Sequence, residues 1–201
     1  MSKVSSISDR RATDAERALP AVDIERVLDV AASMFAEFGF DGVSMREIAR
    51  ESGCHVPSIY YHFTSKDNLY REACAHKLED TIDIINSRVG GIADPRARFC
   101  ELIEAFFDLF TGDRVLMLLM QRDVADAGGQ SRRFLSRRQY DHFSALIRKV
   151  ASDAAGKDIG ADTAFAIGAL VFGYCELSIV VHEAPTRKAK LVEAVMRLLI
   201  S

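Results

Sequence analysis

The chain has 201 residues, of which 49% are hydrophobic and 27% charged, and its formal net charge is −3. This length suits one large domain or two small ones with a buried core, and the composition excludes wholesale disorder. The four cysteines are widely separated without a CxxC pair, which indicates reduced thiols rather than a disulfide framework. The mild acidity does not by itself point to a nucleic-acid-binding protein.

The first 22 residues are polar and lack helical periodicity, so we expect them to form a flexible arm. They also lack the apolar core of a signal peptide. The longest uncharged apolar run, residues 164–175, is too short to span a bilayer comfortably. We therefore expect a soluble, cytoplasmic protein without a membrane partner. The basic residues of the arm are Lys3, Arg10, Arg11 and Arg17.

Helical periodicity follows the arm almost everywhere, and no stretch alternates with the period of two that marks a strand. The first helix should run over residues 23–38, with an Asp at its N-cap and apolar residues three and four apart. The second should cover residues 44–52, where Glu47 stands at the spacing of a capping box. The third should cover residues 56–62, with Pro57 in its first turn.

Six longer or more apolar helices are expected downstream. One should start near residue 66 and continue to about residue 89, before two consecutive glycines. The others should cover residues 95–110, 113–125, 131–155, 162–182 and 186–200. The predicted fold class is therefore all-α, with about nine helices and no sheet.

Residues 44–63 combine two short helices with a tight turn. The small side chain of Ala49 lets a second helix cross closely, and Gly53 supplies the left-handed backbone that such a turn needs. Ile48 and Ile59 are positioned to seal both helices against the first one. This arrangement predicts a helix-turn-helix, whose second helix enters the major groove of DNA by its N-terminal end.

The segment VLDVAASMFAEFGFDGVSMREIARESGCHVPSIYYHFTSKDNLY, residues 27–70, resembles the DNA-binding domain of the TetR family of transcriptional repressors. Several motifs at fixed spacing carry this resemblance, and beyond residue 75 it is only architectural. It implies a three-helix DNA-binding domain over residues 23–68 and a helical ligand-binding and dimerisation domain over residues 69–201. It further implies a homodimeric repressor that a small molecule releases from a palindromic operator.

The resemblance also implies which residues contact double-stranded DNA. Ser44, at a helix cap, would meet a phosphate, and Arg46 would reach a phosphate or a base edge. Tyr60, His62 and Lys66 would hold the DNA backbone. The residues expected to read bases are His55, Val56, Pro57, Ser58 and Tyr61.

These assignments have structural alternatives. Tyr60, Tyr61 and His62 could simply pack against the first helix. Cys54 beside His55 could suggest a metal ligand pair, but adjacent residues point in different directions and no third ligand is near, so no metal site or cofactor is expected. His55 also departs from the small hydroxyl residue that is usual in the family, as Pro57 departs from a small flexible one. The operator sequence therefore cannot be taken from a relative.

The charge balance of the DNA-binding segment is unfavourable if taken as a total. Residues 23–70 hold four Lys or Arg against eight Asp or Glu, a net charge of −4. We expect geometry to decide instead, with Arg46 and Lys66 on the DNA side and most carboxylates on the far side of the first helix. Weak non-specific DNA binding follows, with the basic arm supplying part of the attraction.

Apolar and aromatic residues recur on neighbouring helical turns between residues 99 and 147. Such stripes are typical of plain core, but in a TetR-like chain they also suit the wall of a cavity for an apolar or aromatic effector. Arg122 is a further possible polar anchor, and the basic run at residues 131–138 suits either an anionic ligand or a solvated face. The residues expected at the cavity are Phe99, Ile103, Phe106, Phe107, Phe110, Met117, Met120, Gln121, Tyr140, His142 and Phe143.

The last two predicted helices are apolar nearly all round and need cover on more than one side. A two-fold four-helix interface would supply that cover, and the resemblance implies the same arrangement; the alternative is burial of both helices within one subunit. The expected interface residues are Phe165, Gly168, Ala169, Phe172, Gly173, Leu191, Val195 and Leu198.

An all-α enzyme and a protein-binding helix-turn-helix are the two alternative functional classes. An all-α enzyme is disfavoured, because the sequence shows no activated nucleophile pattern, no Gly-rich phosphate loop and no HExxH spacing, and its five histidines are scattered. A helix-turn-helix that binds another protein instead of DNA remains open, and a selection with random duplex DNA distinguishes the two.

Overall fold

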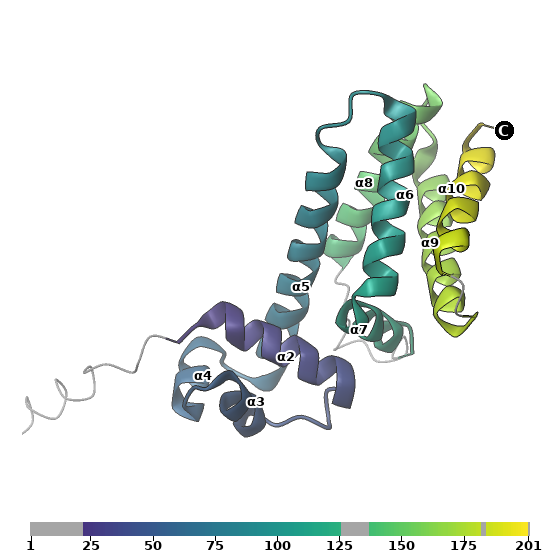
Figure 1. Cartoon of the computed structure of the whole chain (residues 1–201). Coiled ribbons are helices and arrows are strands. Elements are labelled where there is room, and N and C mark those ends of the chain that lie inside the picture. Colours follow the sequence, from purple (N-terminus) through teal and green to yellow (C-terminus); the bar gives the residue numbers. More distant parts are fainter. Residues whose placement is uncertain (1–21, 126–136, 182–183, 201) are drawn as a thin grey trace, which may run out of the picture.

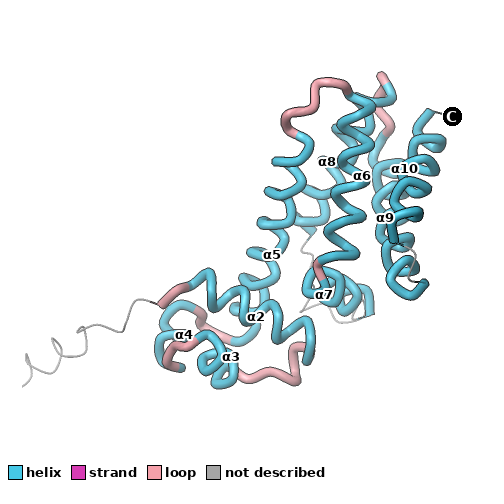
Figure 2. Tube along the Cα trace, in the orientation of Figure 1, coloured by secondary structure: helices cyan, strands magenta, loops and turns pink. Residues whose placement is uncertain are grey.

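The computed structural model describes residues 22–125, 137–181 and 184–200, so the expected arm lies almost wholly outside the described residues. Within these ranges the chain forms helices and no strand (Figure 2), and the all-α prediction is confirmed. The helices are α2 (Ile24–Phe38), α3 (Met45–Ser52), α4 (Val56–His62), α5 (Lys66–Val89), α6 (Pro95–Gly112), α7 (Arg114–Ala125), α8 (Arg137–Ala155), α9 (Gly160–Val181) and α10 (Ala184–Ile200).

The molecule is elongated, with two unequal parts (Figure 1). α2, α3 and α4 form a small cluster at one end, and α6, α8, α9 and α10 form a bundle at the other. α5 packs against α2 in the cluster and continues alongside α6 in the bundle. α7 lies at the junction, in contact with both α2 and α6. Two helices, α5 and α7, therefore connect the small cluster to the bundle.

Capping side chains explain where several helices begin. Asp23 accepts a hydrogen bond from the Arg26 N–H at 3.1 Å, which starts α2 where the sequence predicted. Ser65 and Asp94 do the same for α5 and α6. α9 begins at Gly160, two residues before the predicted start at residue 162, because Asp158 in the preceding turn accepts from the Gly160 N–H at 3.0 Å.

The core of the small cluster joins all of its helices. Phe35 of α2, Ile48 of α3 and Ile59 of α4 are fully buried, which confirms the predicted sealing role of the two isoleucines. Tyr70 of α5 meets the Phe35 ring edge-on, with 5.0 Å between centroids. The first turns of α5 thus belong to this core, and the predicted domain boundary after residue 68 falls inside a continuous helix.

The bundle is held by a buried apolar core and by a charged network at its side. Arg88 of α5 donates to Glu101 and Asp108 of α6, at 2.6 and 3.0 Å. Lys188 of α10 donates to the same Asp108, and this hydrogen bond raises the pKa of Lys188 above its ordinary value. The network therefore ties both α5 and α10 to α6 through the shared Asp108 carboxylate.

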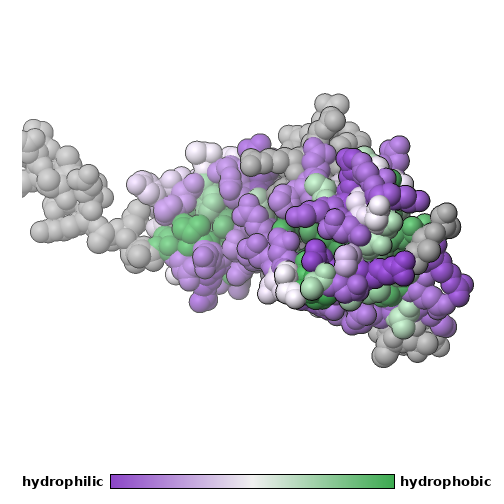
Figure 3. All heavy atoms as spheres, turned by 90° about the horizontal axis from the view of Figure 1, so that it is seen from above, coloured by the Kyte–Doolittle hydropathy of each residue, from purple (hydrophilic) through white to green (hydrophobic). Residues whose placement is uncertain are grey.

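Hydrophilic residues cover most of the face seen in Figure 3, with hydrophobic atoms confined to separate patches. In the part of the chain that the structure describes, no single helix is both long and apolar enough to cross a membrane; α8 and α9 reach that composition and length only as a pair bent by 105°.

Candidate nucleic-acid interface and ligand cavity

The turn between α3 and α4 depends on backbone conformation at Gly53. Its φ of 74° and ψ of 25° lie in the left-handed region, and its N–H donates to the Arg50 carbonyl at 3.2 Å. The Cys54 N–H then donates to the Ala49 carbonyl at 2.9 Å. A Cβ at position 53 would meet no atom within 4 Å, so glycine is favoured by its permitted φ rather than by lack of space. This closes α3 and directs α4 across it.

A capping box fixes the start of α3. The Glu47 N–H donates to Ser44 Oγ at 3.2 Å, and the Ser44 N–H and hydroxyl both donate to the Glu47 carboxylate, at 2.8 and 2.7 Å. The hydroxyl contact and then the backbone contact lower the pKa of Glu47. Because the carboxylate already occupies the Ser44 donors, a phosphate would have to displace it or bind the neighbouring N–H groups of this first turn.

α4 presents an exposed row of aromatic and polar side chains. Tyr61 is 77% exposed, and Tyr60, His62, His55 and Pro57 are exposed as well. The Tyr61 and His62 rings meet edge-on at 5.1 Å. Tyr61 and His62 are therefore not core residues, whereas about half of the Tyr60 surface is covered by its neighbours.

Ser58, one of the residues predicted to contact bases, is buried. Its side chain is 1% exposed, and its hydroxyl has no hydrogen-bond partner among the described residues. Ser58 lies next to the fully buried Ile59, because the short helix turns both residues toward the core of the cluster. Val56 is half-buried and packs against the same core. The residues left free to read bases are therefore His55, Pro57 and Tyr61.

The basic side chains near α4 differ in whether a carboxylate already pairs with them. Arg46 is exposed in the first turn of α3. Lys66 begins α5, with its Nζ 4.4 Å from the centroid of the Phe40 ring, a cation–π contact that holds it beside the cluster. Arg50 instead pairs with its exposed neighbour Glu51 at 2.9 Å. Arg46 and Lys66 are thus the cations that the structure leaves best placed for phosphates.

An apolar cavity of about 320 Å³ lies inside the bundle. Phe106 stacks on Phe110 with centroids 5.7 Å apart and meets Phe143 at 5.4 Å, which builds one aromatic wall. Among the described residues that line the cavity none is charged. They are Leu78, Phe106, Phe110, Met120, Phe143, Ser144, Ile147, Ala164, Phe165, Gly168, Ala169, Val171 and Phe172.

Four of the residues predicted for ligand binding line this cavity, namely Phe106, Phe110, Met120 and Phe143. Four others are buried elsewhere in the core, namely Phe99, Ile103, Phe107 and Met117. The expectation that Gln121 and His142 act as polar anchors is wrong for this cavity, because both side chains are exposed and neither lines it. The side chain of Tyr140 lies outside the described residues, as does most of the basic run at 131–138.

α9 divides the predicted dimer residues between two environments. Phe165, Gly168, Ala169 and Phe172 line the cavity, and Phe165 is also exposed. Exposed apolar side chains continue along α9 and α10 at Leu170, Leu177 and Leu198, while Gly173 is half-buried.

Two residues of the predicted dimer interface, Leu191 and Val195 of α10, are not on the surface. Both are fully buried, because this face of α10 packs on α6 and α9 of the same chain. Any contact with a second copy must therefore use other positions of α10.

Arg122 of α7 has a role that the sequence did not suggest. Its Nε and Nη2 donate to the Ala36 and Glu37 carbonyls at the end of α2, both at 2.9 Å. These carbonyls belong to the last turn of a helix, which attracts a cation. A Cβ at Gly39 would lie 3.0 Å from Arg122 Nη1, so glycine at that position also leaves room for the guanidinium.

A second, more open hollow of about 840 Å³ lies at the corner between α8 and α9. Charged side chains surround it, including Arg148, whose Nε donates to Asp158 at 2.9 Å. The Arg148 contact, followed by the Gly160 N–H, lowers the pKa of Asp158. This corner fits the structural task of closing a helix turn, and it offers no enclosure for an apolar ligand.

Comparison with known proteins assigns the N-terminal part of the chain to a family. Residues 27–73 match the sequence model of a family described as "Bacterial regulatory proteins, tetR family". The HTH-type transcriptional activator FasR of Mycolicibacterium smegmatis is 30% identical over 88 residues, which are 44% of this chain and 40% of FasR. The HTH-type transcriptional repressor KstR2 of Rhodococcus jostii is 29% identical over 98 residues, which are 49% of this chain and 48% of KstR2. The match thus spans less than half the length of these curated relatives.

A solved structure resembles most of the fold. The transcriptional regulator FadR of Bacillus subtilis, in complex with stearoyl-CoA, superposes with a TM-score of 0.71 over 88% of this chain and 97% of FadR. The two sequences are 16% identical, so this likeness is one of fold alone.

Proposed function

This chain belongs to the TetR family of bacterial regulatory proteins, as its residues 27–73 show, and we propose that it is a homodimeric repressor released from a palindromic operator by an apolar small molecule. The observation that carries the proposal is the pairing, in one chain, of the exposed α4 row with a partly open apolar cavity in the bundle. Such a protein acts on DNA in the cytoplasm.

In the proposed complex α4 enters the major groove. His55, Pro57 and Tyr61 face the bases, while Tyr60 and Lys66 hold phosphates on either side. α3 and α4 lie at the end of the molecule away from α9 and α10 (Figure 1), which leaves α4 accessible to a duplex. Arg46 and the N–H groups at the start of α3 add further phosphate contacts.

Dimerisation follows from the exposed apolar residues of α9 and α10. Phe165, Leu170, Leu177 and Leu198 are exposed on these two neighbouring helices. A second copy related by a two-fold axis would cover them, and the pair would present two α4 helices to half-sites about one DNA turn apart.

The cavity sets the chemistry of the effector. Its volume is at the small end of ligand sites, and Ser144 is the one side chain with a hydroxyl among the described lining residues. An uncharged apolar group therefore fits inside it, whereas an anion would lose its hydration without a partner. The stearoyl-CoA complex of FadR supports an effector with an acyl or similar chain whose polar part stays outside.

Two helices carry the signal from cavity to DNA. α5 holds Lys66 at the DNA end and Leu78 in the cavity wall, about 18 Å apart along the helix axis. α7 places Met120 in the cavity wall, and two residues later Arg122 donates hydrogen bonds to the end of α2. Movement of either wall would therefore shift α2 and α4 in both subunits. To move nearly all molecules from the DNA-binding to the released conformation, the effector must bind the released conformation roughly 10⁴-fold more tightly, a difference of about 5.5 kcal/mol.

Selection from random duplex DNA tests the DNA-binding half of the proposal. Recovery of a palindrome supports it, whereas recovery of no palindrome favours a protein-binding helix-turn-helix. A reporter gene behind the recovered site then separates a repressor such as KstR2 from an activator such as FasR.

A thermal-shift screen with apolar and acyl compounds tests the ligand half. A compound at 100 times its dissociation constant should add about 2.7 kcal/mol to the free energy of unfolding. Phe143→Ser should weaken this effect because it puts a hydroxyl into the aromatic wall. Leu109→Ser, at a half-buried position of α6 outside the cavity, is the matched control. If Phe143→Ser and Leu109→Ser lose the same amount of stabilisation by the compound, the effector binds outside this cavity.

A further inference from the structure

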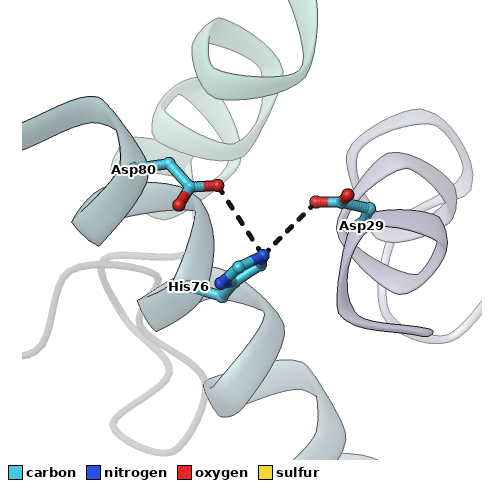
Figure 4. A group of neighbouring side chains, drawn as sticks. All are labelled: Asp29, His76 and Asp80. Carbon is cyan, nitrogen blue, oxygen red and sulfur yellow. Dashed lines mark ion pairs between the residues drawn. The ribbon is translucent and has the colours of Figure 1, made fainter. Parts of the chain in front are cut away.

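Three potential metal ligands meet where α2 packs on α5. His76 Nε2 lies 3.5 Å from Asp29 Oδ1 and 3.6 Å from Asp80 Oδ2, and Figure 4 shows the imidazole between the two carboxylates. The three ligand atoms all lie within 4.8 Å of one another. His76 and Asp80 stand one turn apart on α5, whereas Asp29 comes from α2. The group therefore bridges two helices that are far apart in sequence.

Both contacts are within ion-pair distance, and their spacing also fits a shared ion. Distances of 3.5 and 3.6 Å exceed the usual 2.7–3.2 Å of an N–H···O bond, and they are nearly equal. Ligand atoms about 2.1 Å from one ion lie roughly 3.0–3.5 Å apart at octahedral to tetrahedral angles. The side chains thus need only a small inward movement to coordinate one ion.

The backbone that carries these ligands is already fixed by the core. Ala32 on α2 and Ala73 on α5 are buried, and such small residues permit close approach of the helices. The Phe35–Tyr70 ring contact lies in the same interface. Because packing holds α2 against α5, ion binding does not have to bring the ligands together.

The donor set selects a class of metal. One imidazole nitrogen with two carboxylate oxygens suits divalent Mn, Fe, Co or Zn, whereas Mg²⁺ and Ca²⁺ prefer oxygen ligands alone. The His76 side chain is 22% exposed, and those of Asp29 and Asp80 are 64% and 52% exposed. Water can therefore fill the remaining coordination positions, and the ion can exchange with solvent.

We propose that Asp29, His76 and Asp80 bind one divalent first-row transition-metal ion that clamps α2 of the DNA-binding cluster to α5. The ion also offsets two carboxylates: Asp29, which lies within residues 23–70, whose net charge is −4, and Asp80, which lies beyond that segment. Its binding should therefore strengthen the attraction to DNA phosphates, most visibly at low salt. This site is separate from the cavity and from the α4 row.

Calorimetric titration of the full chain with MnCl₂, CoCl₂ and MgCl₂ tests the site. We expect one Mn²⁺ or Co²⁺ per chain, with Mg²⁺ at least about tenfold weaker. His76→Ala and Asp29→Asn should each weaken Mn²⁺ binding at least about tenfold. His142→Ala, which removes an exposed histidine of α8, should leave it unchanged. Unaltered binding in both site variants, or no binding at millimolar Mn²⁺, overturns the proposal.

The optical spectrum of the Co²⁺ complex identifies the donor atoms. A nitrogen and oxygen set gives only ligand-field bands, so the absence of a thiolate-to-cobalt charge-transfer band supports the site. Cys54 and Cys100 are partly accessible, and a thiolate band that persists in His76→Ala would assign the ion to cysteine and overturn the proposal. Helical circular dichroism of each variant verifies folding. Operator binding without metal is measured separately, so loss of one proposal leaves the other standing.

Discussion

α4 and α9 both expose large side chains, but with opposite chemistry. The exposed residues of α4 include Tyr60, Tyr61 and His62, each an aromatic body with a polar atom at its tip. Those of α9 include Phe165 and Leu177, which have no polar atom to offer water. α4 is therefore suited to a wet, polar partner such as DNA, whereas α9 is suited to an apolar cover. The kind of partner can be inferred from the tips of the exposed side chains.

α9 also differs from α4 in having three faces at once. Ala164, Ile167, Val171 and Cys175 recur at helical spacing and are buried in the core. Burial there, followed by the charge of Asp108, raises the pKa of the Cys175 thiol to about 12. Ala164 and Val171 of this face also line the cavity, as do residues of the adjoining face such as Phe172, and a third face is exposed at Leu177. The helix is consequently apolar all round, because core, cavity and outer surface all require apolar residues.

The largest effect is expected from breaking the apolar outer face. Leu177 is 66% exposed and does not line the cavity, so Leu177→Glu should leave each subunit folded. In a dimer it would bury an unpaired charge from each copy, which costs about 3–5 kcal/mol, and operator affinity should fall more than about 100-fold. Sedimentation at micromolar concentration measures the assembly. Ile84→Glu, at an exposed position of α5, is the control; a dimer that survives Leu177→Glu would move the interface elsewhere.

Neighbouring residues of α4 should separate stability from DNA reading. Ile59→Ala removes a fully buried side chain and should lower the free energy of unfolding by about 2–5 kcal/mol. Tyr61→Ala should leave unfolding nearly unchanged but weaken operator binding by about 1–3 kcal/mol and relax base preference. Urea denaturation and DNA titration at fixed salt measure the two effects. If Tyr61→Ala keeps full operator affinity, α4 does not enter the major groove as proposed.

A smaller loss is expected at the link between the two regions. Arg122→Ala removes two hydrogen bonds from a guanidinium to the end of α2, and should lower the free energy of unfolding by about 1.5–3 kcal/mol. It should also reduce the release of operator by effector, because α7 then no longer holds α2. Arg114→Ala, at an exposed position of the same helix, serves for comparison. Normal release in Arg122→Ala would leave α5 as the sole route.

The smallest effect concerns the α3 cap. Ser44→Ala should lower the free energy of unfolding by about 1 kcal/mol, whereas Ser87→Ala, at an exposed position in the last turn of α5, should not lower it. The folded-state pKa of Glu47 lies below its ordinary 4.5, so its stabilisation is present above that pH and is lost as pH falls through the folded value. Thermal unfolding measured between pH 3 and 6 should therefore show that Ser44→Ala loses less stability on acidification than the unaltered chain does.

Elements with local signals were predictable from the sequence. Asp23, the Ser44–Glu47 pair and Gly53 act within a few residues of chain, and they fixed the bounds of α2 and α3 correctly. The exposed α4 row is also largely predictable, apart from Val56 and Ser58. A seven-residue helix has too few turns for its periodicity to show which side faces the core.

Contacts between distant segments were not predictable in this way. Arg122 lies 86 residues from its acceptor in α2, and nothing in its neighbourhood distinguishes it from an anchor inside a cavity. Asp29 and His76 meet only because α2 packs on α5. Gln121 and His142 were misplaced for the same reason, since an apolar stripe does not reveal which polar neighbours face inward.

The sequence by itself determined the helical class, the helix-turn-helix and the family, because each depends on patterns that repeat within one or two helical turns. Only the tertiary structure decided which apolar residues fill the core, which line the cavity and which remain exposed on α9 and α10. The physical reason is that the burial of a residue depends on its neighbours across the fold: Leu191 and Leu198 are both leucines of α10, yet the first is buried against its own chain and the second is exposed.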